Sequence, residues 1–179
     1  MATLSSTGLT FSNGSSVTGA GRIVAVRYAY YASQITTGGQ YVDDYLSVEV
    51  TMPPAASNDS RYLIMGESNT NDTNSSTKGA GVEIWVETSG GGGSTNSYWV
   101  CRPGTHSHYY NLGSDKYYSL HNFHLDDGAG TYQILAGQTR KYRLYGQNHN
   151  GNVWWHAGVG GQEGPRTKLI VMEIDGSLI

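Results

Sequence analysis

Charged side chains are scarce in this chain of 179 residues: Asp, Glu, Lys and Arg together make up 14% of it, against about 25% in typical globular domains. The formal net charge is −3, and no stretch of the sequence concentrates Lys or Arg. A general nucleic-acid binder needs such a basic footprint. The sequence therefore excludes DNA and RNA as expected partners.

Cysteine and long apolar runs are also nearly absent. The single cysteine, Cys101, cannot form an internal disulfide, so the fold does not depend on an oxidising compartment. The N-terminus lacks the basic and apolar segments of a signal peptide. No apolar run approaches the ~18–20 residues that span a bilayer. We therefore expect synthesis in the cytoplasm and no membrane insertion.

Good helix formers are depleted, whereas glycine, at 25 residues, is about twice as frequent as the usual ~7%. Gly, Ser, Asn and Thr are poor helix formers, and the length suits one domain. A single all-β domain is therefore expected. The aromatic residues are 14 Tyr, 4 Trp and 2 Phe, and rings with a polar tip favour surfaces and interfaces over a dry core.

Hydrophobic periodicity predicts the strands. Arg22–Ala32 carries apolar residues on both faces and is expected to be a long, largely buried strand. Gly81–Thr88 alternates with period two, and Thr167–Ile174 is expected to be a closing strand. Eight to ten short strands with Gly, Asn and Ser turns predict a jelly-roll-like antiparallel β-sandwich over residues 22–179.

Turn signals complete this outline. Asn150-Gly151 predicts a hairpin between Thr139–Asn148 and Val153–His156. The tripeptide Asp126-Asp127-Gly128 is interpreted as a turn between strands. Residues 1–21 are small and polar and are predicted to form a short extended arm. The arm carries two strong apolar residues and then a turn dipeptide: Leu9 and Phe11, followed by Asn13 and Gly14.

Several segments along the chain, among them Gly8–Thr18, Val42–Pro53 and Leu169–Ile174, resemble the fibre domains of bacteriophages, especially marine and cyanobacterial phages. Gly8–Thr18 (GLTFSNGSSVT) is similar to the "I-x-F-x-D/N-G-T/S" segment at the head of those domains. Val42–Pro53 resembles their "L-S-V-x-I-T-P" strand, and Leu169–Ile174 their closing "T-I-T-x-M-E-I". The matches follow the family's order over nearly the whole chain. The chain departs from the family in Gly90–Gly93 and His106–His124.

The resemblance implies a structural protein of the virion surface, made in the host cytoplasm and assembled as a homotrimer. Residues 1–21 would attach it to other virion proteins through the arm residues Leu9, Phe11, Asn13 and Gly14. The family supplies no catalytic residues and no cofactor. A fibre or fibre-tip component that contributes to host attachment is the first hypothesis. A capsid decoration or head-fibre protein on the same fold is the alternative.

Pairs of adjacent aromatic residues are the first candidate contact sites. In a strand, only one ring of such a pair can enter the core. The other ring must meet solvent, a neighbouring subunit or a ligand, and we expect burial between subunits to be more frequent than binding of a host-surface glycan. The pairs are Tyr109 and Tyr110, Tyr117 and Tyr118, and Trp154 and Trp155.

His106 and His108 are a candidate metal site. On a strand, both imidazoles of this H-x-H pattern would face the same way, and a threefold axis would gather six of them around an ion. The alternative is two surface histidines in a polar loop after Pro103-Gly104. The loop is the favoured interpretation.

A carbohydrate-binding lectin or glycan hydrolase is the third hypothesis. Pairs of carboxylates are the candidate residues for a hydrolase site. Hydrolysis needs two carboxyl groups that face each other across a sugar. Adjacent aspartates such as Asp43-Asp44 and Asp126-Asp127 point apart on a strand, and Glu83 and Glu87 are the remaining grouping. We therefore expect no enzymatic activity.

Overall fold

The computed structural model describes residues 2–5, 8–11, 16–18, 22–31, 35–37, 42–43, 48–72, 78–101, 110–112, 117–128, 132–149, 153–155 and 167–176. The regular elements in these ranges are β-strands, and all their pairings are antiparallel. The described part of the chain holds no helix that is long and apolar enough to cross a membrane.

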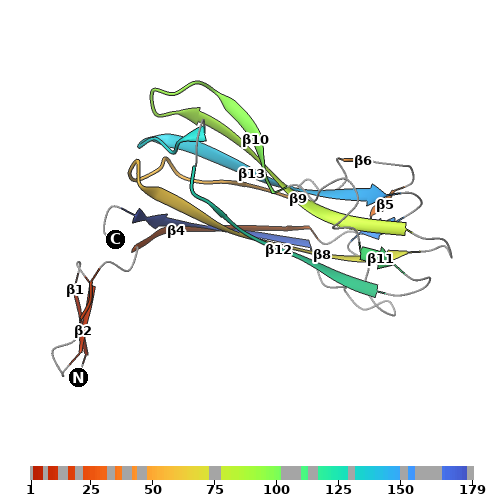
Figure 1. Ribbon diagram of the computed structural model, residues 1–179, viewed down its shortest axis with the longest axis horizontal. Helices are drawn as coiled ribbons and strands as arrows, with labels where there is room; N and C mark the ends of the chain where they lie inside the picture. Colours follow the sequence, from red (N-terminus) through yellow and green to blue (C-terminus); the bar gives the residue numbers. More distant parts are fainter. Residues whose placement is uncertain are drawn as a thin grey trace.

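Two six-stranded sheets form a sandwich (Figure 1). The β8 sheet runs in the order β4 (Arg22–Tyr31), β15 (Thr167–Asp175), β8 (Ser60–Asp72), β14 (Val153–Trp155) and β5 (Ile35–Thr37), with β12 (Tyr117–Asp126) also paired to β8. The β9 sheet runs β10 (Asn96–Cys101), β9 (Lys78–Gly90), β13 (Gln138–His149) and β6 (Val42–Asp43), with β11 (Tyr110–Leu112) paired to β9 and β7 (Val48–Thr51) to β13. The predicted jelly-roll-like β-sandwich is confirmed.

The N-terminal segment pairs within itself. Strands β1 (Ala2–Ser5), β2 (Gly8–Phe11) and β3 (Ser16–Thr18) form a three-stranded sheet of their own. Figure 1 shows β1 and β2 beyond one end of the sandwich. The attachment role of residues 1–21 stays a prediction.

The core lies between the two sheets and follows the period-two pattern of the sequence. In β9, Val82, Ile84 and Val86 are buried, while Trp85 and Glu87 on the opposite side are half-buried. The other core side chains come from both sheets and from the segment after β7: Val48, Val50, Met52, Ala55, Tyr62, Ile64, Leu120, Ile134, Tyr142, Leu144, Leu169 and Val171.

The β9–β10 hairpin uses the glycine run of the sequence. Gly90, Gly91 and Gly92 have φ angles of 77°, 66° and 74°, which glycine adopts without steric cost. The glycines of this turn are therefore explained by the backbone conformation.

The predicted hairpin at Asn150-Gly151 is wrong. Strand β13 belongs to the β9 sheet, whereas Val153–Trp155 (β14) pairs with β8 and β5 in the opposite sheet. The chain therefore crosses from one layer to the other at this point. Asn-Gly supplies a local turn preference, but the partner of the next strand is set by which sheet has a free edge.

The strand predicted at Arg22–Ala32 is present as β4, but its predicted burial is wrong for the isolated chain. Ile23, Val26, Tyr28 and Tyr30 are all exposed. β4 is the first strand in the order of the β8 sheet, and among the described strands only β15 is hydrogen-bonded to it. An apolar strand of this kind needs a cover that one copy of the described chain does not provide.

Candidate functional site

The predicted aromatic pairs are brought partly together. Tyr117 in β12 and Trp154 in β14 are both register partners of Asn71 in β8, and Tyr118 and Trp155 are both partners of Thr70. Four of the six predicted residues therefore lie at one end of β8. Tyr110 lies in the other sheet, in β11, and Tyr109 is outside the described residues.

The remaining predicted site residues lie mostly outside the described ranges. Leu9 belongs to β2, and Phe11 ends that strand. Asn13, Gly14, His106 and His108 are outside the described residues. Within the part of the chain that the structure describes, no group of three His, Cys, Asp or Glu residues could hold a metal ion.

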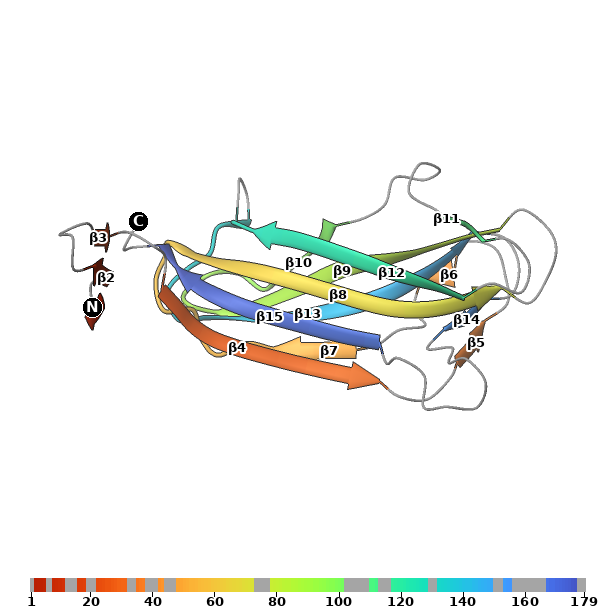
Figure 2. The same ribbon diagram turned by 90° about the horizontal axis from the view of Figure 1, so that it is seen from below.

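Strands β4, β15, β8 and β12 lie side by side in the β8 sheet (Figure 2). The outer face of this sheet carries exposed apolar side chains, and we call it the apolar face. Residues directly opposite each other in antiparallel strands share a face. The registers therefore align three rows across β4, β15, β8 and β12. These rows are Tyr28, Ile170, Met65 and Phe123; Val26, Met172, Leu63 and Leu125; and Ile23, Ile174 and Arg61.

Several side chains of the apolar face are open to solvent. Phe123 is 68% exposed, Tyr28 73%, Ile23 57%, Leu125 48% and Val26 46%. The sequence predicted that β4 is buried. It did not predict that exposed side chains of β12 belong to the same apolar face as those of β4. Period two on β12 carried the signal, because Leu120 faces the core while Phe123 and Leu125 face away from it.

Polar residues bound the apolar face at one end. Lys168 Nζ lies 3.6 Å from Glu67 Oε2, and His121 is the register partner of Glu67 on β12. Tyr30 lies opposite Lys168 on β4. The apolar rows therefore end at a rim that carries charges of both signs.

The outer face of the β9 sheet is different, because ion pairs cross it. Lys141 Nζ lies 2.8 Å from Glu87 Oε2, and Arg143 contacts both Glu49 at 2.7 Å and Glu87 at 2.9 Å. The hydrogen bond from Lys141 lowers the pKa of Glu87 below its usual value. A charged, half-exposed face of this kind is suited to water.

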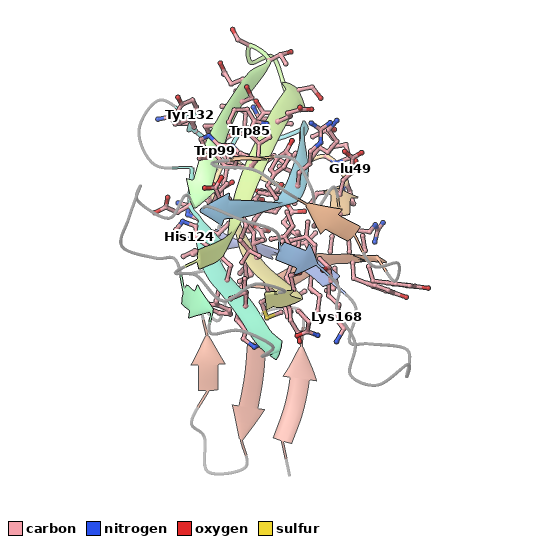
Figure 3. The ribbon with its side chains drawn as sticks, turned by 90° about the vertical axis from the view of Figure 1, so that its right-hand side faces the viewer. Glu49, Trp85, Trp99, His124, Tyr132 and Lys168 are labelled. Atoms are coloured by element: carbon pink, nitrogen blue, oxygen red, sulfur yellow. The ribbon has the colours of Figure 1, made fainter. Side chains whose placement is uncertain are left out.

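An aromatic cluster lies beside these ion pairs. Trp85 and Trp99 have ring centroids 4.8 Å apart in an edge-on arrangement, and Trp99 and Tyr145 are 5.6 Å apart. Figure 3 shows Trp85 and Trp99 next to each other. The two tryptophans are both half-buried.

Arg140 and Asp126 form a buried ion pair between the sheets. Arg140 Nη1 lies 2.7 Å from Asp126 Oδ2, and the side chains are 0% and 4% exposed. The Tyr142 hydroxyl donates to the same oxygen at 2.8 Å, and the Tyr98 hydroxyl donates to the carboxylate at 3.1 Å. Asp126 is therefore a buried residue that ends β12, and the chain leaves the strand at Asp127 and Gly128, where φ is 65°. The predicted turn between strands begins only after Asp126.

Arg140 uses its donors in several directions. Nε donates to Gln138 Oε1, and Nη1 also donates to the Tyr98 hydroxyl. Nη2 donates to the backbone carbonyls of Tyr132 and Gln133. The guanidinium therefore ties β10, β12 and β13 to the segment that follows Tyr132. Period two along β13 puts Arg140 on the same face as the buried Tyr142, and this is the sequence signal by which the buried cation could have been identified.

The tyrosines around this pair are held neutral. Burial raises the pKa of Tyr98 and Tyr142 above its usual value, and the negative charge of Asp126 raises it further. Burial also raises the pKa of Tyr62. At neutral pH these tyrosines are therefore protonated hydrogen-bond donors in a structural cluster, and none of them is a reactive phenolate.

Two small cavities share a wall made by Tyr98 and Tyr132. The rings stack with centroids 4.1 Å apart and planes 19° apart. One cavity, of about 190 Å³, is lined by polar residues including Asn96, Gln133 and Gln138. The other, of about 210 Å³, includes His124 and Asp127 in its lining. This end of the sandwich can therefore accept a small ligand.

Comparisons with known proteins identify the fold alone. No family model and no curated protein matches the chain. The VP2 protein in the subviral particle of infectious bursal disease virus has a similar structure, with a TM-score of 0.52 and 10% sequence identity over 90% of this chain. The chain spans 35% of that VP2 chain. The CBM22-1 xylan-binding domain from Paenibacillus barcinonensis Xyn10C is matched with a TM-score of 0.34 and 12% identity, over 89% of this chain and 98% of that domain.

Proposed function

We propose that this chain is a structural protein of a virus particle whose copies pack together through the apolar face. The observation that carries the proposal is the apolar face itself. The resemblance of several segments to phage fibre domains supports a virion protein, and the fold shared with a viral VP2 protein agrees with it. A location at the virion surface is part of the same proposal.

The size of the apolar face supports a subunit interface. The five most exposed side chains of its rows together present on the order of 500 Å² of apolar surface, since large side chains such as Phe and Tyr each present ~150–250 Å² when fully open. Half-buried residues such as Ile170 and Met65 fill the space between them. The largest patch on a typical monomer is about 300–600 Å², and a stable interface buries about 800 Å² on each partner. At about 500 Å² the apolar face lies in the upper part of the monomer range, where such patches are often functional, and reaches more than half of the area that a stable interface buries on each partner.

A second copy of the same chain is the occupant that fits. Tyr, Phe and Met are enriched at protein interfaces, and a sheet face packs against another sheet at about 10 Å. The rim with Lys168 and Glu67 carries both signs of charge, so neighbouring copies can place opposite charges beside each other. We propose a homotrimer in which the apolar faces of three copies meet around a threefold axis, as the resemblance to phage fibres implies.

Charge substitutions on the apolar face test this assembly. Tyr28→Glu and Phe123→Glu place a carboxylate on exposed positions, so the fold of one subunit is kept while packing between copies is opposed. Thr51→Glu is the matched control, because Thr51 is an exposed strand residue on the charged face, opposite Lys141. Light scattering gives the solution mass.

We expect a mass near three times 19.3 kDa for the unsubstituted chain and for Thr51→Glu, and a monomer for both face variants. A monomeric unsubstituted chain, or face variants that remain trimeric, would overturn the proposed assembly.

The finer assignment is to a fibre or fibre tip that contributes to host attachment, with residues 1–21 bound to other virion proteins. A capsid decoration or head-fibre protein is the alternative. Immunogold labelling of virions separates the two, and label on the head would reject the tail assignment. Deletion of residues 1–21 is expected to leave the trimer intact and to abolish incorporation into particles. Incorporation of the truncated chain would show that the arm is not the attachment segment.

We propose that the protein has no catalytic activity. Asp126, one of the carboxylates considered for hydrolysis, accepts hydrogen bonds from Arg140, Tyr98 and Tyr142. Glu87 is paired with Lys141 and Arg143. Incubation with host polysaccharide is expected to release no new reducing ends, and their release would contradict the proposal.

A further inference from the structure

The smaller cavity described above, which we call the Tyr132 pocket, is lined by groups that suit one class of ligand. It lies between the ends of β9 and β13, the β9–β10 turn and the segment after Tyr132. Its volume of about 190 Å³ is somewhat larger than a cavity of about 150 Å³ that holds one benzene ring. The pocket therefore has space for a single six-membered ring.

One wall of the Tyr132 pocket is aromatic and held in place. Tyr132 is 38% exposed and stacks on Tyr98. Tyr98 is fixed in turn, because its hydroxyl donates to Asp126 and accepts from Arg140. A rigid tyrosine offers a large amphipathic contact area at low entropic cost.

The remaining walls offer neutral groups that both donate and accept hydrogen bonds. Ser94, Asn96 and Gln133 are exposed at the pocket, and Gln138 lies buried beneath it. Amide and hydroxyl side chains of this kind match a ligand rich in hydroxyl groups, since each such group can donate or accept. A few placed polar groups beside an aromatic wall are what orient a small ligand.

The charges of the Tyr132 pocket disfavour an anion. Among the described residues that line it, none is a carboxylate, and Arg140 is the one cation. The Arg140 N–H groups are already directed to Gln138, Tyr98, Asp126 and the carbonyls of Tyr132 and Gln133. An anionic ligand would find no guanidinium donor left to pair with.

We propose that the Tyr132 pocket binds one ring of a neutral saccharide, which packs against Tyr132 and bonds to the amide and hydroxyl groups around it. The pocket lies within one subunit, on the side of the molecule away from the rows of the apolar face. The proposal therefore stands without the self-association proposed above. Tyr98 and Tyr132 were not among the adjacent aromatic pairs that the sequence offered as contact sites.

Titration of the full chain with defined sugars tests the proposal. The probes are the methyl glycosides of glucose, galactose, mannose and xylose together with N-acetylglucosamine, and the anionic comparison is glucuronic acid. Saturation-transfer NMR detects binding, and calorimetry measures the dissociation constant. We expect at least one neutral sugar to saturate in the millimolar range and to bind more tightly than glucuronic acid.

Variants locate the bound sugar. Tyr132→Ala is expected to weaken binding by about tenfold through loss of the ring contact, and Gln133→Ala to weaken it as well. Tyr28→Ala is the matched control, because it removes a tyrosine from the apolar face that is even more exposed, at 73% against 38% for Tyr132. It should leave sugar binding unchanged, just as Tyr132→Ala should leave the solution mass unchanged.

Three results would overturn the proposal: no neutral sugar saturates, glucuronic acid binds more tightly, or both pocket variants bind as the unsubstituted chain does. Circular dichroism confirms that each variant is folded. Gln133→Ala keeps the test decisive if Tyr132→Ala does not fold, because Arg140 contacts only the backbone carbonyl of Gln133.

Discussion

Tyr62 and Tyr142 lie ring to ring in the core, with centroids 5.6 Å apart, but their hydroxyl groups are in different situations. The Tyr142 hydroxyl donates to Asp126 at 2.8 Å. The Tyr62 hydroxyl is equally buried and has no hydrogen-bond partner among the described residues. A buried polar group without a partner costs about 1–3 kcal/mol of stability.

Removal of each hydroxyl should therefore have opposite effects. Tyr62→Phe is expected to stabilise the fold by about 1 kcal/mol, since it removes an unsatisfied group without changing the ring. Tyr142→Phe is expected to destabilise it by about 1.5–3 kcal/mol, because it removes a hydrogen bond to a charged group. Urea unfolding of the two variants beside the unsubstituted chain measures both. Equal effects of the same sign would contradict the assignment of these two hydroxyl groups.

The buried ion pair predicts a large effect at Asp126. Asp126→Ala leaves the Arg140 guanidinium charged and unpaired in the core, at a cost of about 3–5 kcal/mol. Asp127→Ala is the control, because the neighbouring aspartate is exposed and surface changes usually stay within about 0.5 kcal/mol. Denaturant midpoints give the comparison. If Asp126→Ala costs no more than Asp127→Ala, the ion pair does not stabilise the fold.

Alkaline pH should unfold the protein through the same cluster. The usual tyrosine pKa is 10.0, and the pKa of Tyr142 is raised well above it in the fold. Above pH 10 the unfolded chain loses the phenolic proton and the folded chain keeps it, so stability is full below about pH 10 and falls as pH rises. For the fully buried Tyr142 the slope is up to about 1.4 kcal/mol per pH unit.

Urea midpoints measured from neutral to alkaline pH, with tyrosinate absorbance as a second signal, follow this loss. Tyr142→Phe should show a shallower decline, whereas an unchanged slope would mean that Tyr142 does not couple to unfolding.

Gly128 provides a backbone prediction. Its φ angle is 65°, and an added Cβ would lie 2.8 Å from the backbone nitrogen of Ile134. Gly92 has a similar φ of 74° but open space around it. Gly92→Ala should therefore cost only the left-handed conformation, about 1–2 kcal/mol, and Gly128→Ala should cost more. Thermal melts of both variants measure the difference. Equal losses would show that the contact with Ile134 relaxes freely.

Local patterns predicted the strands well, because side chains alternate across a strand whatever sheet it joins. The strand predicted at Thr167–Ile174 ends one residue later in the structure, at Asp175, and Thr139–Asn148 differs from β13 by one residue at each end. The partner of each strand was harder to predict from the sequence. Asn150-Gly151 predicted a hairpin, but β14 joins the opposite sheet, since pairing depends on an edge formed by residues far along the chain.

The candidate sites were predictable only in residue type. Paired aromatics were expected to need a partner surface, and Tyr117 and Trp154 do converge beside Asn71. The Tyr98–Tyr132 stack has no sequence signal, because these residues are 34 positions apart and meet through the Arg140 network. Asp126 resembled a turn residue in sequence, and only its three hydrogen-bonding neighbours identify it as part of the core.

Composition alone determined that this protein is all-β, since few charged residues, many glycines and poor helix formers leave no other regular structure that the chain could build. The tertiary structure decided which apolar side chains are buried and which are exposed. Isoleucines in two apolar strands of the same sheet differ in this way, since Ile64 is buried while Ile23 is 57% exposed. The difference arises because burial depends on the opposing layer, and the β9 sheet covers one face of the β8 sheet but not the other.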